Sequence, residues 1–177
     1  GIDIRKVGSG NIGATNVTRA VGPKAGKICF FLDFLKGTLP TLVAQFLPNC
    51  PVWLPLVAGM CALLGHTFPI YLKFKGGKAV ATSLGVLLIT VPLSGVCALV
   101  VFLVALLITG IVSISSTCAT LAAWISAMIL YAFTIDNKLY SCLFLITLVI
   151  LIVLKHIPNY KRLLNGTENS FKKKKVK

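Results

Sequence analysis

Charged side chains are scarce in this sequence of 177 residues. Asp, Glu, Lys and Arg make up only 12% of it, and just 4 residues are acidic. The 57 residues between Lys78 and Asp136 carry no charge at all. Because about a quarter of the residues of a soluble domain are charged, this composition argues against a soluble fold.

The uncharged stretch is also too long for one membrane span. As a single helix its 57 residues would measure about 86 Å, against a hydrocarbon core of about 30 Å. Across the chain, turn-forming residues such as Pro92 separate six apolar stretches. These stretches are 28–47, 51–72, 79–91, 93–112, 117–135 and 139–154. We therefore predict an all-α membrane protein, a polytopic helical bundle with six transmembrane helices, of which 79–91 is short.

The charges that remain are almost all positive. Lys and Arg number 18, which gives a net charge of +14. Such an excess is typical of nucleic-acid-binding proteins and of segments that face the anionic cytoplasmic leaflet. Five basic residues lie in 1–27, three in 73–78 and eight from Lys155 onward, so six crossings place all three segments on one side. We therefore predict the lipid bilayer as a partner, no nucleic acid, and these segments in the cytoplasm.

The cysteines and acidic residues do not suggest a disulfide framework or a metal site. Of the 6 cysteines, Cys50 lies at a turn and the other five lie in apolar stretches, where we expect small, buried hydrophobic side chains. No spacing of His, Cys, Asp or Glu is typical of metal ligands. Neither a metal nor a cofactor is predicted.

The first polar segment is rich in glycine, and an arginine follows it. It reads Gly8-Ser9-Gly10-Asn11-Ile12-Gly13-Ala14-Thr15-Asn16, with Arg19 one helical turn later. Small residues let backbone N–H groups approach an anion, and an arginine can bind phosphate through two hydrogen bonds. The match to the dinucleotide motif G-x-G-x-x-G is only formal, since no hydrophobic strand precedes Gly8. The alternative is a flexible loop at the membrane interface.

A second polar segment follows the stretch 51–72. It contains Gly65-His66 and Lys73-Phe74-Lys75-Gly76-Gly77-Lys78. Gly-Gly-Lys at the start of a helix offers free backbone donors and a full positive charge to a phosphate group. The alternative is that these lysines only fix the topology. We expect His66 to be a hydrogen-bonded structural residue rather than a catalyst.

Two further groups of polar residues accompany these segments. Asp33 and Lys36 lie three apart in the first span and can form an ion pair, of either structural or functional importance. Ser113, Ser115 and Ser116 lie on an uncharged inner loop, 110–116, where they could donate hydrogen bonds to an anion or cap a helix.

The last basic segment follows the last span. It contains His156, Asn159 and Arg162, and the histidine is a candidate for orienting or protonating a phosphorylated substrate. The alternative is a juxtamembrane basic helix. We assign residues 1–171 to a single membrane domain and 172–177 to a basic cytoplasmic tail.

Three such segments at one membrane face favour a site for two phosphate-bearing ligands beside a hydrocarbon-lined groove. No Ser-His-Asp arrangement or H-x-x-x-x-D pattern of a conventional acyltransferase is recognisable. The sequence resembles the bacterial acyl-phosphate:glycerol-3-phosphate acyltransferases, integral membrane enzymes of phospholipid synthesis. The matching motifs are Gly8 to Val17 with Arg19, Asp33-Phe34-Leu35-Lys36-Gly37, Gly65-His66 with Phe68-Pro69, Phe74-Lys75-Gly76-Gly77-Lys78, and His156, Asn159, Arg162-Leu163-Leu164 and Gly166-Thr167-Glu168.

This resemblance implies a fold and a reaction. Members of the family have seven transmembrane helices with the N-terminus outside, which fits the six crossings here if one helix precedes Gly1 in the intact protein. The reaction is transfer of a fatty acyl group from acyl phosphate to the 1-hydroxyl of glycerol 3-phosphate, which gives lysophosphatidate and phosphate. It takes place at the cytoplasmic face of the bacterial inner membrane, and we expect no acyl-enzyme intermediate.

The resemblance also implies the residues of the site. The residues expected to act in catalysis are Ser9, Arg19, Lys78 and His156. Those expected to bind substrate are Gly10, Asn11, Gly13, Thr15, Asn16, Gly76, Gly77, Ser113, Ser116, Asn159 and Arg162. The chain departs from the family at Ala79, where glycine is usual, and at Ile157-Pro158, where a more polar pair is usual. These departures bear on activity rather than on the fold.

Two other functions fit parts of the pattern. A membrane transporter of a small phosphate ester or anion also uses glycine-rich broken helices, but its site would lie at the bilayer midplane and repeat in two halves, and no internal repeat is visible. A structural scaffold would not need His156, Lys78 and Arg19 together. The sequence predicts neither the oligomeric state nor the acyl-chain preference.

Overall fold

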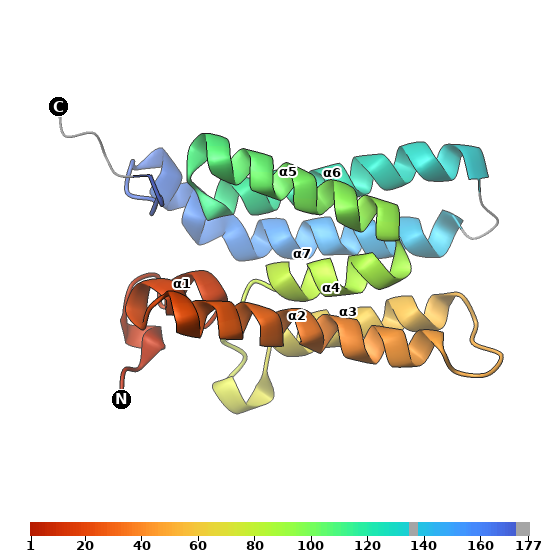
Figure 1. The fold of residues 1–177 in the computed structure, drawn as a ribbon, viewed down its shortest axis with the longest axis horizontal. Coiled ribbons are helices and arrows are strands. Elements are labelled where there is room, and N and C mark those ends of the chain that lie inside the picture. The colour runs from red at the N-terminus through yellow and green to blue at the C-terminus, as the bar shows by residue number, and fades with distance from the viewer. Residues whose placement is uncertain (135–137, 173–177) are drawn as a thin grey trace. The chain divides into compact units, whose positions relative to one another are not determined.

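The computed structural model describes residues 1–134 and 138–172 of the chain (Figure 1). The regular structure of this part is entirely helical, as predicted, with seven α-helices and two short 3-10 helices, labelled η. The chain divides into two compact units, residues 1–90 and 91–177, called the N-terminal and the C-terminal unit below.

The N-terminal unit contains four of the α-helices. They are α1 (Ala14–Ala20), α2 (Pro23–Gln45), α3 (Trp53–Thr67) and α4 (Val80–Thr90), with η1 (Ile4–Lys6) before α1 and η2 (Ile70–Leu72) after α3. Gly22, with a φ of 124°, separates α1 from α2 in a conformation that favours glycine. Pro23 then occupies the first turn of α2, where the N–H that proline lacks would have no helical acceptor.

Helix α4 is short but largely buried in this unit, where it packs mainly on α2 and also on α3. Thr82 and Val86 are fully buried. A Cβ at Gly37 of α2 would lie 2.2 Å from the Thr82 carbonyl oxygen. A Cβ at Gly85 of α4 would likewise lie 2.5 Å from the Phe34 carbonyl oxygen. The two backbones therefore approach so closely that a side chain on either glycine would force them apart.

The C-terminal unit contains three long helices. They are α5 (Pro92–Thr109), α6 (Val112–Thr134) and α7 (Lys138–Leu164). Pro92 opens α5, and Gly110, with a φ of 70°, ends it in the left-handed conformation usual after a helix. Fully buried side chains include the small Ala123 and Ala127 on α6. On α7 they include the large Leu148 and Ile152. Helix α6 contacts both α5 and α7 and so forms the centre of the unit.

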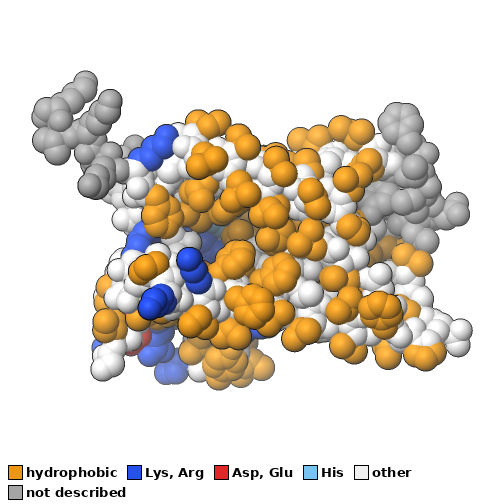
Figure 2. Space-filling model, in the orientation of Figure 1, with side chains coloured by type: hydrophobic (Ala, Val, Ile, Leu, Met, Phe, Trp, Pro, Cys, Tyr) orange, Lys and Arg blue, Asp and Glu red, His pale blue; other side chains and the backbone are white. Residues whose placement is uncertain are grey.

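All six predicted apolar helices are present. Among the described residues, five helices are long and apolar enough to cross a membrane: α2, α3 continued by η2, α5, α6 and α7. The sixth, α4, has 11 residues, as expected of the short stretch 79–91. Figure 2 shows hydrophobic side chains over most of the visible surface, whereas lysine and arginine side chains gather near the α1 end of the N-terminal unit. Apolar outer faces of this kind are expected of helices in contact with lipid.

Several boundaries differ from the sequence prediction. Helix α2 begins at Pro23 rather than at 28, because Gly22 and Pro23 together start it. Helix α7 continues to Leu164 instead of ending at 154, with Pro158 inside it. The predicted loop 110–116 is reduced to two residues, so the serines that follow lie in α6. The predicted turn at Asp136 and most of the predicted tail 172–177 lie outside the described residues.

The prediction that the five cysteines of the apolar stretches are buried was wrong. All six are free; Cys61 is exposed, and the other five are partly exposed. An apolar stretch of a membrane protein does not imply burial within the protein, because lipid solvates its outer face as well as a protein core would.

Replacing Gly37 with alanine should weaken the contact between α2 and α4. The added methyl group would meet the Thr82 carbonyl oxygen, and overpacking of a tight contact costs about 1–3 kcal/mol of unfolding free energy. We expect a lower melting temperature in detergent, measured by tryptophan fluorescence. Gly65→Ala is the matched control, since a Cβ at Gly65 meets nothing within 4 Å. Equal melting temperatures for the two variants would contradict the close approach.

Candidate functional site

The glycine-rich segment forms a compact loop before α1. Gly8 and Gly10 have φ values of 60° and 69°, in the left-handed region that glycine adopts without strain. The Gly10 N–H donates to the Val7 carbonyl at 3.1 Å. The Gly13 N–H donates to the Asn11 side-chain oxygen at 2.8 Å. The loop therefore has a defined turn structure, made by its own glycines and one of its own side chains.

Asn16, on α1, holds this loop from inside. Its buried side chain donates to the carbonyl oxygens of Ile4 and Val7 at 2.9 and 3.0 Å. Its side-chain oxygen accepts a hydrogen bond from the Ser9 N–H at 2.9 Å. A Cβ at Gly8 would lie 2.4 Å from that oxygen, so this contact requires a glycine. Asn16 thus fixes the backbone at Ser9, whereas a direct contact between Asn16 and a substrate stays a prediction.

The second glycine-rich segment is bonded to the end of α3. The Gly76 N–H donates to the Thr67 carbonyl at 3.2 Å, and the Gly77 N–H donates to the His66 carbonyl at 3.1 Å. Lys78 follows directly, two residues before the start of α4. The segment therefore places a lysine close to the N-terminal end of a helix, as predicted, but the prediction of free backbone donors at Gly76 and Gly77 was wrong, because α3 accepts both hydrogen bonds.

Asp33, a buried carboxylate on α2, contacts one residue next to each of these two segments, namely Cys29 and His66. The Asp33 side chain is only 8% exposed and accepts a hydrogen bond from Lys36 Nζ at 2.9 Å, so the predicted ion pair is confirmed. His66 Nδ1 lies 3.5 Å from the same carboxylate oxygen. Cys29 Sγ lies 3.7 Å from the other carboxylate oxygen and 3.7 Å from the carbonyl oxygen of Ile12 in the first loop.

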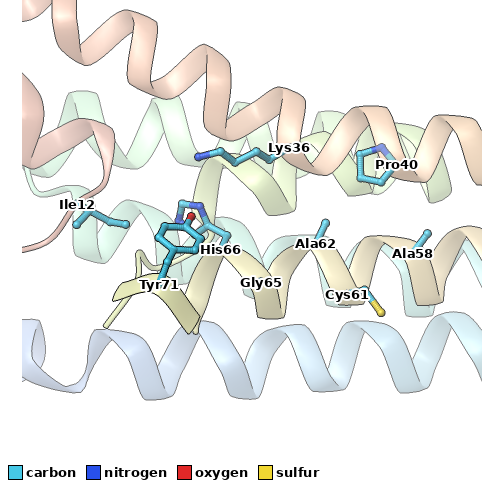
Figure 3. Close-up of a pocket in the computed structure, with 9 residues that line it drawn as sticks. All are labelled: Ile12, Lys36, Pro40, Ala58, Cys61, Ala62, Gly65, His66 and Tyr71. Atoms are coloured by element: carbon cyan, nitrogen blue, oxygen red, sulfur yellow. The ribbon is translucent and has the colours of Figure 1, made fainter. Parts of the chain in front are cut away.

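Lys36 and His66, two residues that contact this carboxylate, also line a pocket of about 430 Å³ (Figure 3). Three of its lining residues are polar: Lys36 on α2, His66 on α3 and Tyr71 on η2. The others are small or apolar, namely Ile12, Pro40, Ala58, Cys61, Ala62 and Gly65. The His66 side chain is nearly buried beside Asp33, as expected of a structural residue.

In the C-terminal unit, three predicted substrate-binding residues meet around one carboxylate. Glu168 accepts hydrogen bonds from Ser113 Oγ at 2.9 Å, Asn159 Nδ2 at 2.6 Å and Arg162 Nε at 2.8 Å. Only 6% of the Glu168 side chain is exposed. Burial alone would raise the pKa of this carboxyl, but the hydrogen bonds from Asn159, Ser113 and Arg162 outweigh it and hold that pKa below its usual value. This cluster links α6 and α7 to the segment after α7.

Ser116 does not join this cluster. Its hydroxyl donates to the Val112 carbonyl at 2.8 Å, one turn earlier in α6, and Ser115 bonds the Ile111 carbonyl in the same way at 2.9 Å. Serines inside a helix commonly bond their own backbone in this manner. Because α6 begins before these residues, they are helical residues and not members of an inner loop.

His156 is fully buried on α7. Its Nδ1 lies 2.8 Å from the Ile152 carbonyl oxygen. A carbonyl can only accept a hydrogen bond, so Nδ1 carries the proton and Nε2 is the basic nitrogen of the neutral ring. The backbone of α7 thus fixes the orientation of the His156 ring. The segment is helical, in keeping with the alternative of a basic helix.

The contacts of Glu168 were not predicted from the sequence. The signal was available, because Glu168 is one of only 4 acidic residues and follows Arg162 by six positions in a basic segment. Within the described residues, no group of three or more His, Cys, Asp or Glu side chains could hold a metal ion.

Comparison with known proteins decides the family. A family model described as glycerol-3-phosphate acyltransferase matches residues 1–166. The chain belongs to the glycerol-3-phosphate acyltransferase family. Glycerol-3-phosphate acyltransferases of Aquifex aeolicus and Bacillus subtilis are 41% and 44% identical to it, each over 97% of this chain and over 86% and 85% of their own lengths.

Solved structures agree with this assignment to the glycerol-3-phosphate acyltransferases. A crystal structure of PlsY, an integral membrane glycerol 3-phosphate acyltransferase, in its glycerol 3-phosphate form has a TM-score of 0.85 and 40% identity, and covers 97% of this chain and 84% of that one. The lysophosphatidic acid form has a TM-score of 0.82 and 38% identity, over 93% and 81%. The predicted family, the helical membrane fold and the acyltransferase activity are thereby confirmed, and the chain is an integral membrane enzyme of phospholipid synthesis.

The Glu168 cluster predicts a pH-dependent stability. Because the folded-state pKa of Glu168 is lowered, its stabilisation is complete above the unfolded-state pKa of about 4.3 and is lost as the pH falls through the lower, folded-state value. At pH 7, Glu168→Gln should lower the unfolding free energy by about 1–3 kcal/mol. The measurement is the melting temperature in detergent between pH 3 and 7, and the gap between wild type and variant should narrow as the pH falls below the unfolded-state pKa.

Asp3→Asn is the control for this experiment. It also removes a carboxylate that is paired with an arginine, Arg5, but at an exposed site, where such pairs contribute little. It should leave the melting temperature nearly unchanged at every pH. A gap for Glu168→Gln that persists unchanged at pH 3 would contradict the role of the ionised carboxylate.

Ala79, for which the family resemblance implies glycine, should tolerate replacement by glycine but not by valine. Ala79 has a φ of 59° and is 1% exposed. Glycine would relieve about 1 kcal/mol of left-handed strain, and it would lose about 0.8 kcal/mol from the buried methyl group. We expect little net change in the melting temperature for Ala79→Gly and a clear decrease for Ala79→Val. Similar melting temperatures for the two variants would show that the backbone at 79 is unstrained.

Proposed function

We propose that the protein transfers a fatty acyl group from acyl phosphate to the 1-hydroxyl of glycerol 3-phosphate. The products are lysophosphatidate and inorganic phosphate. The names of the solved PlsY forms, with glycerol 3-phosphate and with lysophosphatidic acid, support the acceptor and the product. The donor is proposed from the chemistry of this chain together with the family resemblance.

The observation that carries the proposal is the pair of glycine-rich segments in the N-terminal unit. Ser9 lies in a loop held by Asn16, and Lys78 follows a Gly-Gly pair that is bonded to α3. The Gly76 and Gly77 N–H groups are taken up by α3, so the group of this segment that suits a phosphate is the lysine just before α4. Acyl phosphate is already activated, so positioning and charge neutralisation suffice for its reaction with a hydroxyl.

In the proposed step, the 1-hydroxyl oxygen attacks the carbonyl carbon of acyl phosphate. A carbon–oxygen ester bond forms, and the bond between the acyl carbon and the phosphate oxygen breaks. The electron pair of that bond leaves with the phosphate, whose developing charge Arg19 and Lys78 stabilise. The hydroxyl proton passes to a substrate phosphate or to His156, the residue that the family resemblance implies.

The remaining assignments follow the family resemblance. We propose that substrate phosphates contact the segments at Gly10, Asn11, Gly13, Thr15, Asn16, Gly76 and Gly77, and that Ser113, Ser116, Asn159 and Arg162 contribute to substrate binding. Asn159, Arg162 and Ser113 would do so while bonded to Glu168. We also propose that residues 1–171 act as one domain.

We propose the bacterial inner membrane as the location, with the site facing the cytoplasm. The support is the distribution of basic residues, because Lys and Arg collect in 1–27, 73–78 and the segment from Lys155 onward, while residues 48–50 and 92–95 include none. Cytoplasmic placement also suits both phosphate-bearing substrates.

The proposed donor predicts a specific pattern of phosphate release. The purified protein in detergent or lipidic phase should release phosphate from palmitoyl phosphate only when glycerol 3-phosphate is present. It should not transfer the acyl group of palmitoyl-CoA. Transfer from the CoA ester at a comparable rate would refute acyl phosphate as the dedicated donor, and a covalently acylated Ser9 would refute direct attack by the hydroxyl.

Lys78→Met should reduce turnover by about 10²–10³-fold, since it removes a charge placed to stabilise the leaving phosphate. Lys75→Met is the matched control, because it removes the same charge from an exposed position of the same segment. The control should change the rate by less than about threefold, as expected of a surface charge screened by salt. Equal losses in the two variants would indicate a general effect of surface potential and would contradict the specific role of Lys78.

A further inference from the structure

Asp33 is a buried carboxylate that the proposed reaction does not use. It lies on α2, within a membrane-spanning helix, where an ionisable residue is costly and usually has a functional or structural partner. Its evident partner is Lys36, but 56% of the lysine side chain is exposed, against 8% of the aspartate. An exposed lysine can extend toward water without Asp33, so this ion pair alone does not account for a buried carboxylate.

The second neighbour of Asp33 is His66, on α3. Its Nδ1 lies 3.5 Å from the carboxylate oxygen that also binds Lys36, and its side chain is nearly buried. A histidine beside a carboxylate is held in one orientation with its Nδ1 toward the oxygen. The other ring nitrogen, Nε2, then points away from Asp33.

The far side of the His66 ring lies against the Gly-Gly pair. A Cβ built at Gly77 would be 2.0 Å from Nε2 of His66, so the ring occupies the space that a side chain at 77 would need. The backbone of His66 contacts the same residue, because its carbonyl accepts the Gly77 N–H at 3.1 Å. Side chain and backbone of His66 therefore both fix the chain just before Lys78.

We propose that Asp33 and His66 are positioning residues. Asp33 orients the His66 ring, and the ring fixes the backbone path of Gly76-Gly77-Lys78. The chain of contacts runs from the α2 carboxylate through the imidazole to the Gly77 backbone. In this role both residues act through the backbone before Lys78 rather than on the reacting atoms. The inference rests on the proposed function for its consequence on catalysis, because it acts through the position of Lys78.

The first experiment measures the Gly-Gly segment directly and needs no activity. Hydrogen–deuterium exchange of the purified protein reports the Gly76 and Gly77 N–H groups, which are bonded to the end of α3. Asp33→Asn and His66→Gln should each raise their exchange rate by about tenfold or more, because the bonds open more often when the ring is free to turn. Lys36→Gln is the matched control, since it removes the charge of the other Asp33 partner and should leave the rate within about twofold of wild type.

The double variant D33N/K36Q keeps the test decisive if Asp33→Asn alone fails to fold. It leaves neither partner charged, so it should fold even if Asp33→Asn alone does not. It should show the same faster exchange at Gly76 and Gly77 as Asp33→Asn. The proposal would be overturned if Lys36→Gln raised the exchange rate as much as Asp33→Asn, or if the double variant exchanged like wild type. Asp33 would then act only as the ion-pair partner of Lys36.

The second experiment measures the route to catalysis. Asp33→Asn should lower kcat/KM for phosphate release from palmitoyl phosphate with glycerol 3-phosphate by about tenfold, with the surface control Lys75→Met near wild type. In a Lys78→Met background, Asp33→Asn should have almost no further effect, because the two residues act through one path. An undiminished effect in that background would refute action through Lys78. Wild-type protein that transfers no acyl group would refute the proposed function, while the exchange experiment would still decide the positioning role.

Discussion

The close contact between α2 and α4 is the constraint on which the N-terminal unit depends. Helices in lipid gain little from hydrophobic burial against one another, so their association relies on van der Waals contact and hydrogen bonds. Gly37 and Gly85 allow the two backbones to touch, and this contact holds a helix of only 11 residues in place. Because Lys78 lies just before α4, the position of the lysine follows from this crossing.

Each unit is organised around one buried carboxylate. Many hydroxyl groups in the helices bond the carbonyl one turn earlier in their own helix; Thr38, Thr41 and Ser83 are examples. Asp33 and Glu168 differ, because each collects donors from separate parts of its unit. In a chain with 4 acidic residues, these two join polar segments to the apolar helices around them.

The sequence was sufficient for the helices and the polar segments, because both depend on local composition. A run without charge predicts spans, and glycine with lysine predicts a phosphate-binding segment, whatever lies elsewhere in the chain. The start of α6 could not be predicted, because its first turn carries serines that an inner loop would carry equally well. The partner of Ser113 lies 55 residues away, and no periodicity or spacing indicates such a pair. Asn16 and His66 were identified as residues of interest, but their contacts depend on the folded backbone.

The segment after α7 is part of the folded C-terminal unit. Glu168 is not its only contact with the helices. The Ser170 hydroxyl and the Phe171 N–H both donate to the carbonyl of Gly110, between α5 and α6, at 3.2 and 2.8 Å. These bonds satisfy a carbonyl that the end of a helix leaves without an intrahelical partner. An affinity tag or fusion partner is therefore best joined beyond residue 172. Trimming the chain back to the end of α7 would expose the Gly110 carbonyl and Arg162.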